Sequence, residues 1–287
     1  MIYFVQGQFV PESEARIAIL DRGFLYGDSV YETVRSVKGK IIFLREHSQR
    51  LRRSAHLLGL EISPEPYDLA DLLAELLRRN QLDDANMRII VTRGQGDRDQ
   101  LTGFTPTWVV LVEPFSSLPE ERYETGVAAV IVSTVRNALG ALSPEIKSSN
   151  LLNNILARRE ALRRGAAEGI MLNPEGALAE GAHTNLFWVD RDGALCTPAL
   201  TVGILAGVTR MKVLDVARSL GIRVKEVTAK PAELENAKEI FLTSTTLEVM
   251  AVTTLDGRRV GDGRRGETTG KLHVGFRRLV ESEVHGA

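Results

Sequence analysis

The sequence predicts a mixed α/β (α+β) fold in two domains, and three observations lead to this prediction. The chain has 287 residues, which is enough for one large domain or for two of modest size. Strand-like apolar segments alternate with helix-like amphipathic segments along the chain. Residues 114–121, "PFSSLPEE", interrupt this alternation with turn-forming residues. We therefore expect a small N-terminal α/β domain at residues 1–115, a linker at 116–121 and a larger C-terminal domain at 122–287.

The N-terminal part carries both strand and helix patterns. Its first residues alternate between apolar and polar side chains, as they do in a half-buried strand. Apolar residues then recur at helical spacing in two segments, and two further apolar runs flank a glycine-rich loop. We expect strands at residues 1–10, 39–44, 87–94 and 107–115, and helices at 45–60 and 66–79.

The C-terminal part repeats this alternation. Leu152, Ile155, Leu156 and Leu162 fall on one face of a helix. Gly221 suits the position just after the last turn of another helix, where the backbone often turns left-handed. We expect strands at residues 126–133, 169–173, 185–190, 194–198, 222–227, 239–244 and 250–260, and helices at 149–164, 209–221 and 268–282.

The composition is that of ordinary globular proteins, with 44% hydrophobic and 25% charged residues. A net charge of −1 provides no overall basic field, so we expect neither nucleic acid nor a membrane surface as a partner. No apolar run approaches the roughly 20 residues that span a bilayer. The N-terminus lacks the basic segment and long apolar core of a secretory signal. The default expectation is a cytoplasmic enzyme or binding protein.

Neither cysteine nor histidine is arranged for a metal site. Cys196 is the only cysteine, which excludes an intramolecular disulfide and a cysteine metal cluster. The five histidines show no metal-ligand spacing, so we expect no metal. The sequence also lacks a P-loop and a G-x-S-x-G nucleophile motif.

Two turns offer groups suited to a phosphate. In "GILAGVTR", Val208 and Thr209 take the first positions of an expected helix, where free amides and the helix dipole favour an anion. In "LTSTTLEV", a cluster of hydroxyls follows a strand, and Thr245 and Glu248 fit a capping box. Ordinary helix caps are the simpler explanation of both turns.

Three charged residues complete the set of candidates. Arg50 lies in "HSQRLRRSA". It is either a solvated helix arginine or an arginine whose planar guanidinium binds a phosphate. Glu180 precedes a strongly apolar strand, so it is either a surface acid or an inward acid that holds a proton on a partner nitrogen. Lys147 is either a surface lysine or, once its amine is neutral, a nucleophile.

Six segments of the chain occur in the order and spacing of one family. They resemble the class IV, fold-type IV pyridoxal-phosphate (PLP) aminotransferases, a family that includes D-amino-acid transaminase, branched-chain aminotransferase and 4-amino-4-deoxychorismate lyase. The resemblance covers nearly the whole chain and implies a two-domain enzyme with PLP as its cofactor. The segments are "DRGFLYGDSVYETVR" (21–35), "HSQRLRRSA" (47–55), "IKSSNLLNN" (146–154), "LAEGAHTNLFWV" (178–189), "GILAGVTR" (203–210) and "LTSTTLEV" (242–249).

The resemblance implies a role for each candidate. Lys147 is similar to the family's Schiff-base lysine, and Glu180 to its partner of the pyridine nitrogen. Only lysine suits the first role, because arginine stays protonated and cannot form an imine. Arg50 resembles the family's phosphate arginine. Tyr31 matches an active-site tyrosine near the substrate carboxylate.

The same resemblance implies a phosphate cup. Backbone and hydroxyl contacts would come from Val208 and Thr209. Ser244 and Thr245 would complete the cup, and the phosphate would anchor the cofactor without taking part in the chemistry.

The motifs specify the substrate less closely than the cofactor, and several alternatives stay open. Thr33 stands where branched-chain enzymes usually have glycine, which favours a D-amino-acid-transaminase-like pocket of the D-alanine/D-glutamate type. Arg98 matches an arginine that binds the α-carboxylate in those enzymes, but Gln100 replaces a nearby histidine. The alternatives are a branched-chain L-amino-acid aminotransferase, an (R)-amine transaminase and the lyase. A branched-chain enzyme is disfavoured further because Asn150 and its neighbours provide no tyrosine for the cofactor's phenolic oxygen.

A protein of a different class also stays open, namely a non-catalytic paralogue that binds PLP. The presence of both Lys147 and Glu180 argues against it. The expected partners are a small amino donor and a 2-oxo acid acceptor. The resemblance also implies a homodimer with the active site near the interface, where the segment around Arg98 would act.

Overall fold

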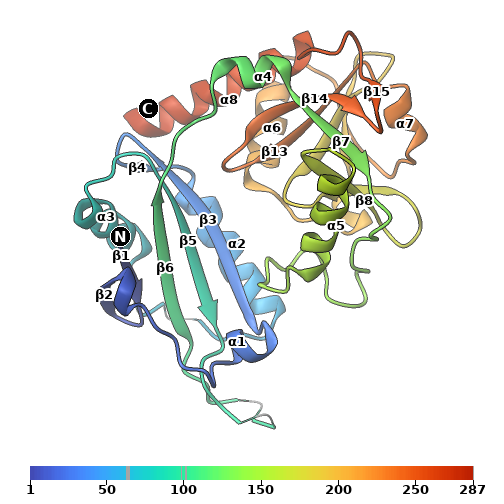
Figure 1. Cartoon of the computed structure of the whole chain (residues 1–287). Helices are drawn as coiled ribbons and strands as arrows, with labels where there is room; N and C mark the ends of the chain where they lie inside the picture. Colours follow the sequence, from blue (N-terminus) through green and yellow to red (C-terminus); the bar gives the residue numbers. More distant parts are fainter. Residues whose placement is uncertain (63–64, 98, 101, 287) are drawn as a thin grey trace. The chain divides into compact units, whose positions relative to one another are not determined.

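The computed structural model describes residues 1–62, 65–97, 99–100 and 102–286, and it shows a mixed α/β fold (Figure 1). Its contacts divide the chain into two compact units. Unit 1 contains Met1–Ser116, the short segment Ile146–Asn150 and the described residues from Ser282 onward. Unit 2 contains Ser117–Glu145 and Leu151–Glu281.

The predicted domain boundaries differ from this division at two segments. The prediction assigns residues 122–287 to the C-terminal domain, whereas Ile146–Asn150 and the described residues from Ser282 onward group with unit 1. Helix α4 (Glu120–Thr125) begins inside the predicted linker. The domain division as a whole remains a prediction.

Unit 1 is built on an antiparallel sheet of six strands in the order β2-β1-β6-β5-β3-β4. Figure 1 shows β3, β5 and β6 as its long central strands, with α2 and α3 beside them. The strands are β1 (Ile2–Val5), β2 (Gln8–Pro11), β3 (Ser29–Val37), β4 (Lys40–Ile41), β5 (Ala85–Thr92) and β6 (Thr107–Pro114). The helices are η1 (Glu12–Glu14), α1 (Arg22–Tyr26), α2 (Leu44–Leu57) and α3 (Leu69–Asn80).

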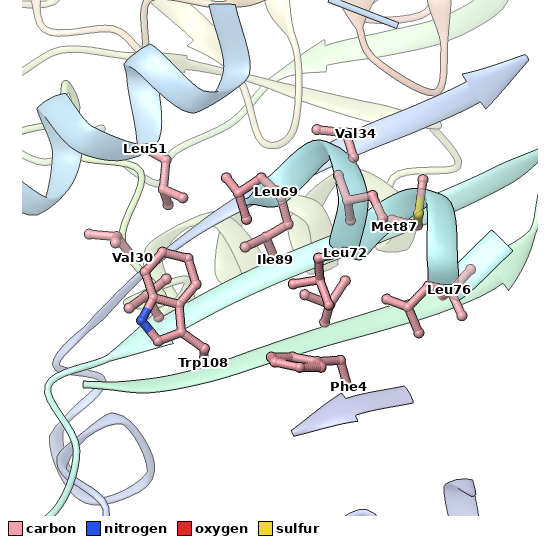
Figure 2. Close-up of a cluster of buried hydrophobic side chains, with 14 of the residues drawn as sticks. Phe4, Val30, Val34, Leu51, Leu69, Leu72, Leu76, Met87, Ile89 and Trp108 are labelled. Atoms are coloured by element: carbon pink, nitrogen blue, oxygen red, sulfur yellow. The ribbon is translucent and has the colours of Figure 1, made fainter. Parts of the chain in front are cut away.

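The core of unit 1 forms where α3 packs its apolar face on this sheet. Asp68 caps α3 by accepting hydrogen bonds from the amides of Ala70 and Asp71. Figure 2 shows leucines of α3 over Met87, Ile89 and Trp108 of the central strands. Burial of this apolar surface is the main force that holds the helix to the sheet.

Unit 2 is built on a nine-stranded mixed sheet in the order β12-β11-β10-β13-β14-β7-β8-β9, with β15 paired to β14. Its parallel pairs are β11 with β12, β14 with β7 and β7 with β8. The strands are β7 (Val127–Ile131), β8 (Glu168–Leu172), β9 (Leu178–Gly181), β10 (Asn185–Val189), β11 (Leu195–Pro198), β12 (Val224–Val227), β13 (Glu239–Ser244), β14 (Glu248–Leu255) and β15 (Arg258–Arg259). Besides α4, the helices are α5 (Leu152–Arg163), η2 (Leu200–Val202), α6 (Val208–Ser219), α7 (Ala232–Glu235) and α8 (Glu267–His285).

Most predicted elements are present, and three predictions are wrong in detail. Residues 1–10 form a hairpin and not one strand, because Gln6 and Gly7 both have positive φ and turn the chain. The expected strand at 39–44 contains only Lys40–Ile41. The capping box at Thr245 does not exist, because Glu248 begins strand β14 and closes a β-hairpin with β13.

Helix α5 lies where it is predicted, but its leucines do not face the core. Leu152, Ile155, Leu156 and Leu162 are between 44% and 75% exposed. The buried residues of α5 are alanines, which allow the helix to approach the sheet closely. The described helices include none that is long and apolar enough to span a membrane.

Packing in unit 1 predicts a clear stability difference between two leucines. Leu73 is fully buried in the apolar cluster of unit 1, whereas Leu57 is 45% exposed. Leu73→Ala should lower the free energy of unfolding by about 2–5 kcal/mol, because it leaves a cavity in a close-packed core. Urea denaturation followed by circular dichroism measures the change. Leu57→Ala is the matched control, and an equal loss in both variants would contradict the core assignment.

Candidate functional site

Lys147 lies beside strand β3 and helix α2 of unit 1. The Tyr31 amide donates to the Lys147 carbonyl oxygen at 2.9 Å. The Lys147 amide donates to Ser54 Oγ of α2 at 3.1 Å, and Val30 forms an isolated bridge with Ser148. These backbone contacts fix the lysine on both sides, so its half-buried side chain starts from a defined position.

The Lys147 amine lies over an aromatic ring. Its Nζ is 4.3 Å from the ring centroid of Tyr31, which is within cation–π distance. Thr33 follows two residues later on β3, so its side chain points to the same face of the sheet as that of Tyr31. The structure therefore brings Lys147, Tyr31 and Thr33 together in unit 1.

Arg88 of β5 joins this group, although the sequence analysis does not identify it. It lies opposite Thr33 in the strand register, and its guanidinium carbon is 4.1 Å from the Tyr31 ring centroid. Its Nε is buried and has no hydrogen-bond partner within the described ranges. A buried donor without a partner is costly, so this nitrogen is suited to an incoming anion. The only signal in the sequence is one arginine within an apolar strand.

Arg50 is held by a buried carboxylate on the neighbouring strand. Its Nε and Nη2 donate to Glu32 Oε1 and Oε2 at 2.6 and 2.7 Å, and His47 Nδ1 lies 2.8 Å from Glu32 Oε2. Burial would raise the pKa of Glu32, but the charge of Arg50 and hydrogen bonds from Arg50 and His47 hold this pKa below its ordinary value. Burial lowers the pKa of His47 in spite of its hydrogen bond to Glu32. The planar fork of Arg50 is thus oriented by an ionised partner.

Glu180 is the centre of a second group, in unit 2. It lies on β9 and is only 4% exposed. Its Oε1 accepts from Arg136 Nε at 2.9 Å. Its Oε2 accepts from Asn185 Nδ2 at 3.1 Å and from the Leu205 amide at 3.0 Å. Three donors keep this buried carboxylate in one orientation, and the sequence analysis identifies none of them.

A second buried carboxylate shapes the turn that follows Glu180. Glu168 accepts hydrogen bonds from the Gly169 and Ala182 amides and from Thr184 Oγ1. Burial raises the pKa of Glu168 in spite of these donors. A Cβ at Gly181 would lie 2.1 Å from Thr184 Oγ1, so this tight turn requires glycine. This turn between β9 and β10 directs Asn185 toward Glu180.

Asn185 also links Glu180 to the start of helix α6. Gly207 precedes α6, and no side chain caps the helix there. A Cβ at Gly207 would lie 1.9 Å from Asn185 Oδ1, so only glycine allows this approach. Val208 and Thr209 form the buried first turn of α6, where backbone amides point along the helix axis.

The end of strand β13 lies next to the same asparagine. Asn185 is directly opposite Thr243 in the sheet, and Ser244 and Thr245 follow. Ser244 Oγ accepts from the Leu247 amide at 3.1 Å, which closes the turn between β13 and β14. Thr243 Oγ1 is buried without a hydrogen-bond partner in the part of the chain that the structure describes.

The predicted site residues therefore fall into two groups, one in each unit. Unit 1 holds Lys147, Tyr31, Thr33 and Arg50, and unit 2 holds Glu180, Val208, Thr209, Ser244 and Thr245. Arg98 lies outside the described residues.

The chemistry of the unit 2 group is specific. Amides at a helix start and nearby hydroxyls suit a phosphate, and an oriented carboxylate suits a protonated ring nitrogen. Asn185 approaches Gly207 closely, and the buried Thr243 hydroxyl has no hydrogen-bond partner in the described residues. Both observations are consistent with a ligand held at this edge of the sheet. These groups fit PLP, and a lysine amine of unit 1 is the residue type that binds its aldehyde.

Comparison with known proteins agrees with this chemistry. The family model for class IV aminotransferases matches residues 29–255. A D-alanine aminotransferase from Bacillus licheniformis is 35% identical over 97% of this chain and 96% of its own length. A branched-chain aminotransferase structure from Thermoproteus uzoniensis with norvaline has a TM-score of 0.89 and 33% identity, covering 99% of this chain and 95% of that one.

A third comparison concerns the cofactor. The structure of a hypothetical aminotransferase from Mycobacterium tuberculosis in its PLP-bound form has a TM-score of 0.83 and 25% identity, covering 98% of this chain and 99% of that one. The family model spans most of this chain, and its relatives match it almost from end to end. The chain therefore belongs to the class IV aminotransferases and is a PLP-dependent transaminase that acts on small amino and keto acid substrates.

Proposed function

We propose that this transaminase moves an amino group between an amino acid and a 2-oxo acid with a substrate range of the D-alanine/D-glutamate type. The observation that carries the amino-acid part of this proposal is that the Lys147 amine and the Arg88 guanidinium both lie close to the Tyr31 ring, and that Arg88 Nε is buried without a partner in the described residues. An amine and an anion-binding arginine near the same ring suit a substrate that carries both a reacting Cα and a carboxylate.

Lys147 would hold the cofactor covalently through Nζ. When it is not bound to the cofactor, its amine would act as the general base that accepts the proton of the substrate Cα. PLP, when bound, supplies an electron sink for the carbon that loses this proton.

Glu180 holds a proton on the ring nitrogen of the cofactor. Arg136, Asn185 and the Leu205 amide donate to the carboxylate, so its orientation is fixed before the cofactor binds. A protonated ring nitrogen makes the cofactor a better electron acceptor, so Glu180 lowers the barrier to proton removal at Cα.

The phosphate is held in unit 2 by the Val208 and Thr209 amides, the Thr209 hydroxyl and the turn at Ser244 and Thr245. The family resemblance also assigns phosphate binding to Arg50, whose guanidinium Glu32 keeps oriented. These contacts anchor the cofactor while Lys147 is free to move protons.

The choice between D-amino acids and branched-chain L-amino acids rests on the pocket residues. Thr33 occupies the substrate face of β3, and a D-alanine aminotransferase is among the relatives. Branched-chain aminotransferase structures match the chain over almost its whole length, which makes this activity the second candidate. Arg98 would contribute to carboxylate binding in either case. The unpartnered Arg88 nitrogen argues against an amine substrate that lacks a carboxylate.

We also propose that the enzyme is a homodimer. Unit 1 exposes a run of apolar side chains at Ile19, Leu20 and Phe24, which are 60–76% exposed, and unit 2 exposes the leucines of α5. Apolar surface of this kind commonly marks a protein interface, and a second copy is the partner that the family resemblance suggests. The cytoplasmic location remains a prediction.

The role of Lys147 is tested by reduction and by substitution. Borohydride treatment of the PLP-loaded enzyme should attach the cofactor to Lys147 alone, as read by peptide mass spectrometry. Lys147→Ala should lower the transamination rate at least about 100-fold, because it removes the group that moves the proton. Lys40→Ala, at an exposed position of unit 1, is the control. Labelling of another lysine would overturn the assignment.

The substrate class is tested by single half-reactions followed through the cofactor's visible absorbance. We expect the band to shift with D-alanine and to stay unchanged with (R)-1-phenylethylamine and with aminodeoxychorismate. Reaction with L-leucine but not with D-alanine would replace the first proposal by the second.

Arg88 provides a separate test of carboxylate binding. Arg88→Met should raise KM for amino-acid donors about tenfold, because it removes a charge-assisted hydrogen bond. Far-UV circular dichroism checks that the sheet is intact. An unchanged KM would show that Arg88 does not contact the carboxylate.

The homodimer is tested by light scattering after size-exclusion chromatography. The wild type should have twice the chain mass of 31.6 kDa. Phe24→Glu should shift the equilibrium toward monomer, because a charge cannot be buried in an apolar interface without cost. Leu57→Glu, a similar change at another exposed apolar residue of unit 1, should leave the mass unchanged. A monomeric wild type would contradict the proposal.

A further inference from the structure

A strained residue closes the turn Ser244–Glu248, which is the turn assigned above to the cofactor phosphate. Glu248 has φ of 57°, a left-handed backbone conformation that is uncommon for a residue with a side chain. It is directly paired with Ser244 across the hairpin, and the Leu247 amide donates to Ser244 Oγ. Strain of this kind persists only when surrounding contacts impose it, and it is found most often at functional sites.

The side chain of this residue is held by helix α8. The Glu248 carboxylate is only 3% exposed, and its Oε2 accepts from Arg277 Nε at 2.8 Å. His273 Nε2 lies 2.8 Å from the same oxygen, and this histidine is 1% exposed. Two nitrogen donors of α8, one turn apart, therefore hold one carboxylate oxygen at the base of the turn.

A second layer of contacts holds these two donors in place. Arg277 Nη1 donates to Glu120 of α4 at 2.6 Å, and the Tyr123 ring packs 4.4 Å from the His273 ring, centroid to centroid. Arg265 Nη1 lies 3.4 Å from His273 Nδ1. The carboxylate is thus fixed from its far side, while the hydroxyls of the turn remain half-buried at the other.

We propose that Glu248 is a positioning residue that holds the 244–248 turn in the conformation that receives the PLP phosphate. The carboxylate does not touch the phosphate. It acts by tying the start of β14 to α8, so that Ser244 Oγ and the amides of the turn are fixed before the cofactor binds. A preorganised turn binds the phosphate without an ordering cost. This inference rests on the proposed placement of the phosphate at Ser244 and Thr245.

The test compares two ligands that differ only in the phosphate. Full-length apoprotein is titrated with PLP and with pyridoxal. The dissociation constant of pyridoxal divided by that of PLP measures the phosphate contribution. Glu248→Gln should reduce this ratio about tenfold, because a neutral amide oxygen accepts more weakly than a carboxylate from Arg277 and His273 and so loosens the link to α8. Binding of pyridoxal, and the melting temperature of the apoprotein, are measured in parallel. A wild-type ratio in Glu248→Gln overturns the inference.

Further variants keep the test decisive if Glu248→Gln fails to fold. Arg277 is 37% exposed, so Arg277→Met should fold and should reduce the ratio about threefold. His273→Gln retains a donor for Glu248 and should keep the ratio within about twofold of wild type, whereas His273→Leu should lower it. A wild-type ratio in both Arg277→Met and His273→Leu overturns the inference.

A control variant separates the turn from general damage to α8. Glu239→Gln removes the carboxylate that accepts from the Thr268 and Thr269 amides at the start of α8. It should keep the wild-type ratio even where the melting temperature falls. A drop as large as that of Glu248→Gln in this control overturns the inference.

Failure of the proposed phosphate site is recognised separately. Ser244→Ala combined with Thr245→Val should lower the ratio if the turn binds the phosphate. A wild-type ratio in this double variant overturns the placement of the phosphate, and the inference with it. A lowered ratio in the double variant with a wild-type ratio in Glu248→Gln overturns the inference alone.

Discussion

The hydrogen bonds that position the buried Glu180 carboxylate are the constraint on which the unit 2 site depends. They join strand β9 to Arg136, to Asn185 at the start of β10, and to the Leu205 amide just before α6. A buried carboxylate is stable only when its lone pairs are satisfied, so these segments must meet at this point. The start of α6 and the end of β13 are placed as a consequence.

The same constraint explains two residues that carry no chemistry. Gly207 cannot carry a side chain, because Asn185 fills the space that a Cβ would need. Gly181 is limited in the same way by Thr184 and Glu168. These glycines are therefore as important to the site as the groups that contact a ligand, since they allow Asn185 to reach Glu180.

The parts of the fold that the sequence predicts well are those set by local pattern. Gly221 has a positive φ just after α6, as expected, and the β10–β11 hairpin forms through the turn before Ala194. Strand β3 is not among the expected strands. It contains Glu32, a buried charge whose partner Arg50 lies 18 residues away on α2, and local pattern does not reveal such a partner.

The same limit applies to the site. The motifs place Glu180 and the α6 turn in one unit, but they do not reveal Arg136 or Asn185, because these are identified only by their contacts with the Glu180 carboxylate. The face of α5 that carries the leucines is apolar in sequence, yet periodicity does not show which face of a helix another chain covers. These leucines are exposed and do not pack in the core of the chain.

The pairing of Arg50 with Glu32 has a consequence for the protein before it is loaded with cofactor. An arginine whose charge is already balanced by a buried carboxylate attracts small ions less than a lone arginine does. Sulfate or citrate in a buffer should therefore compete only weakly for this position. Selectivity would then come from the shape and directed donors of the whole phosphate cup, and not from a single strong positive charge.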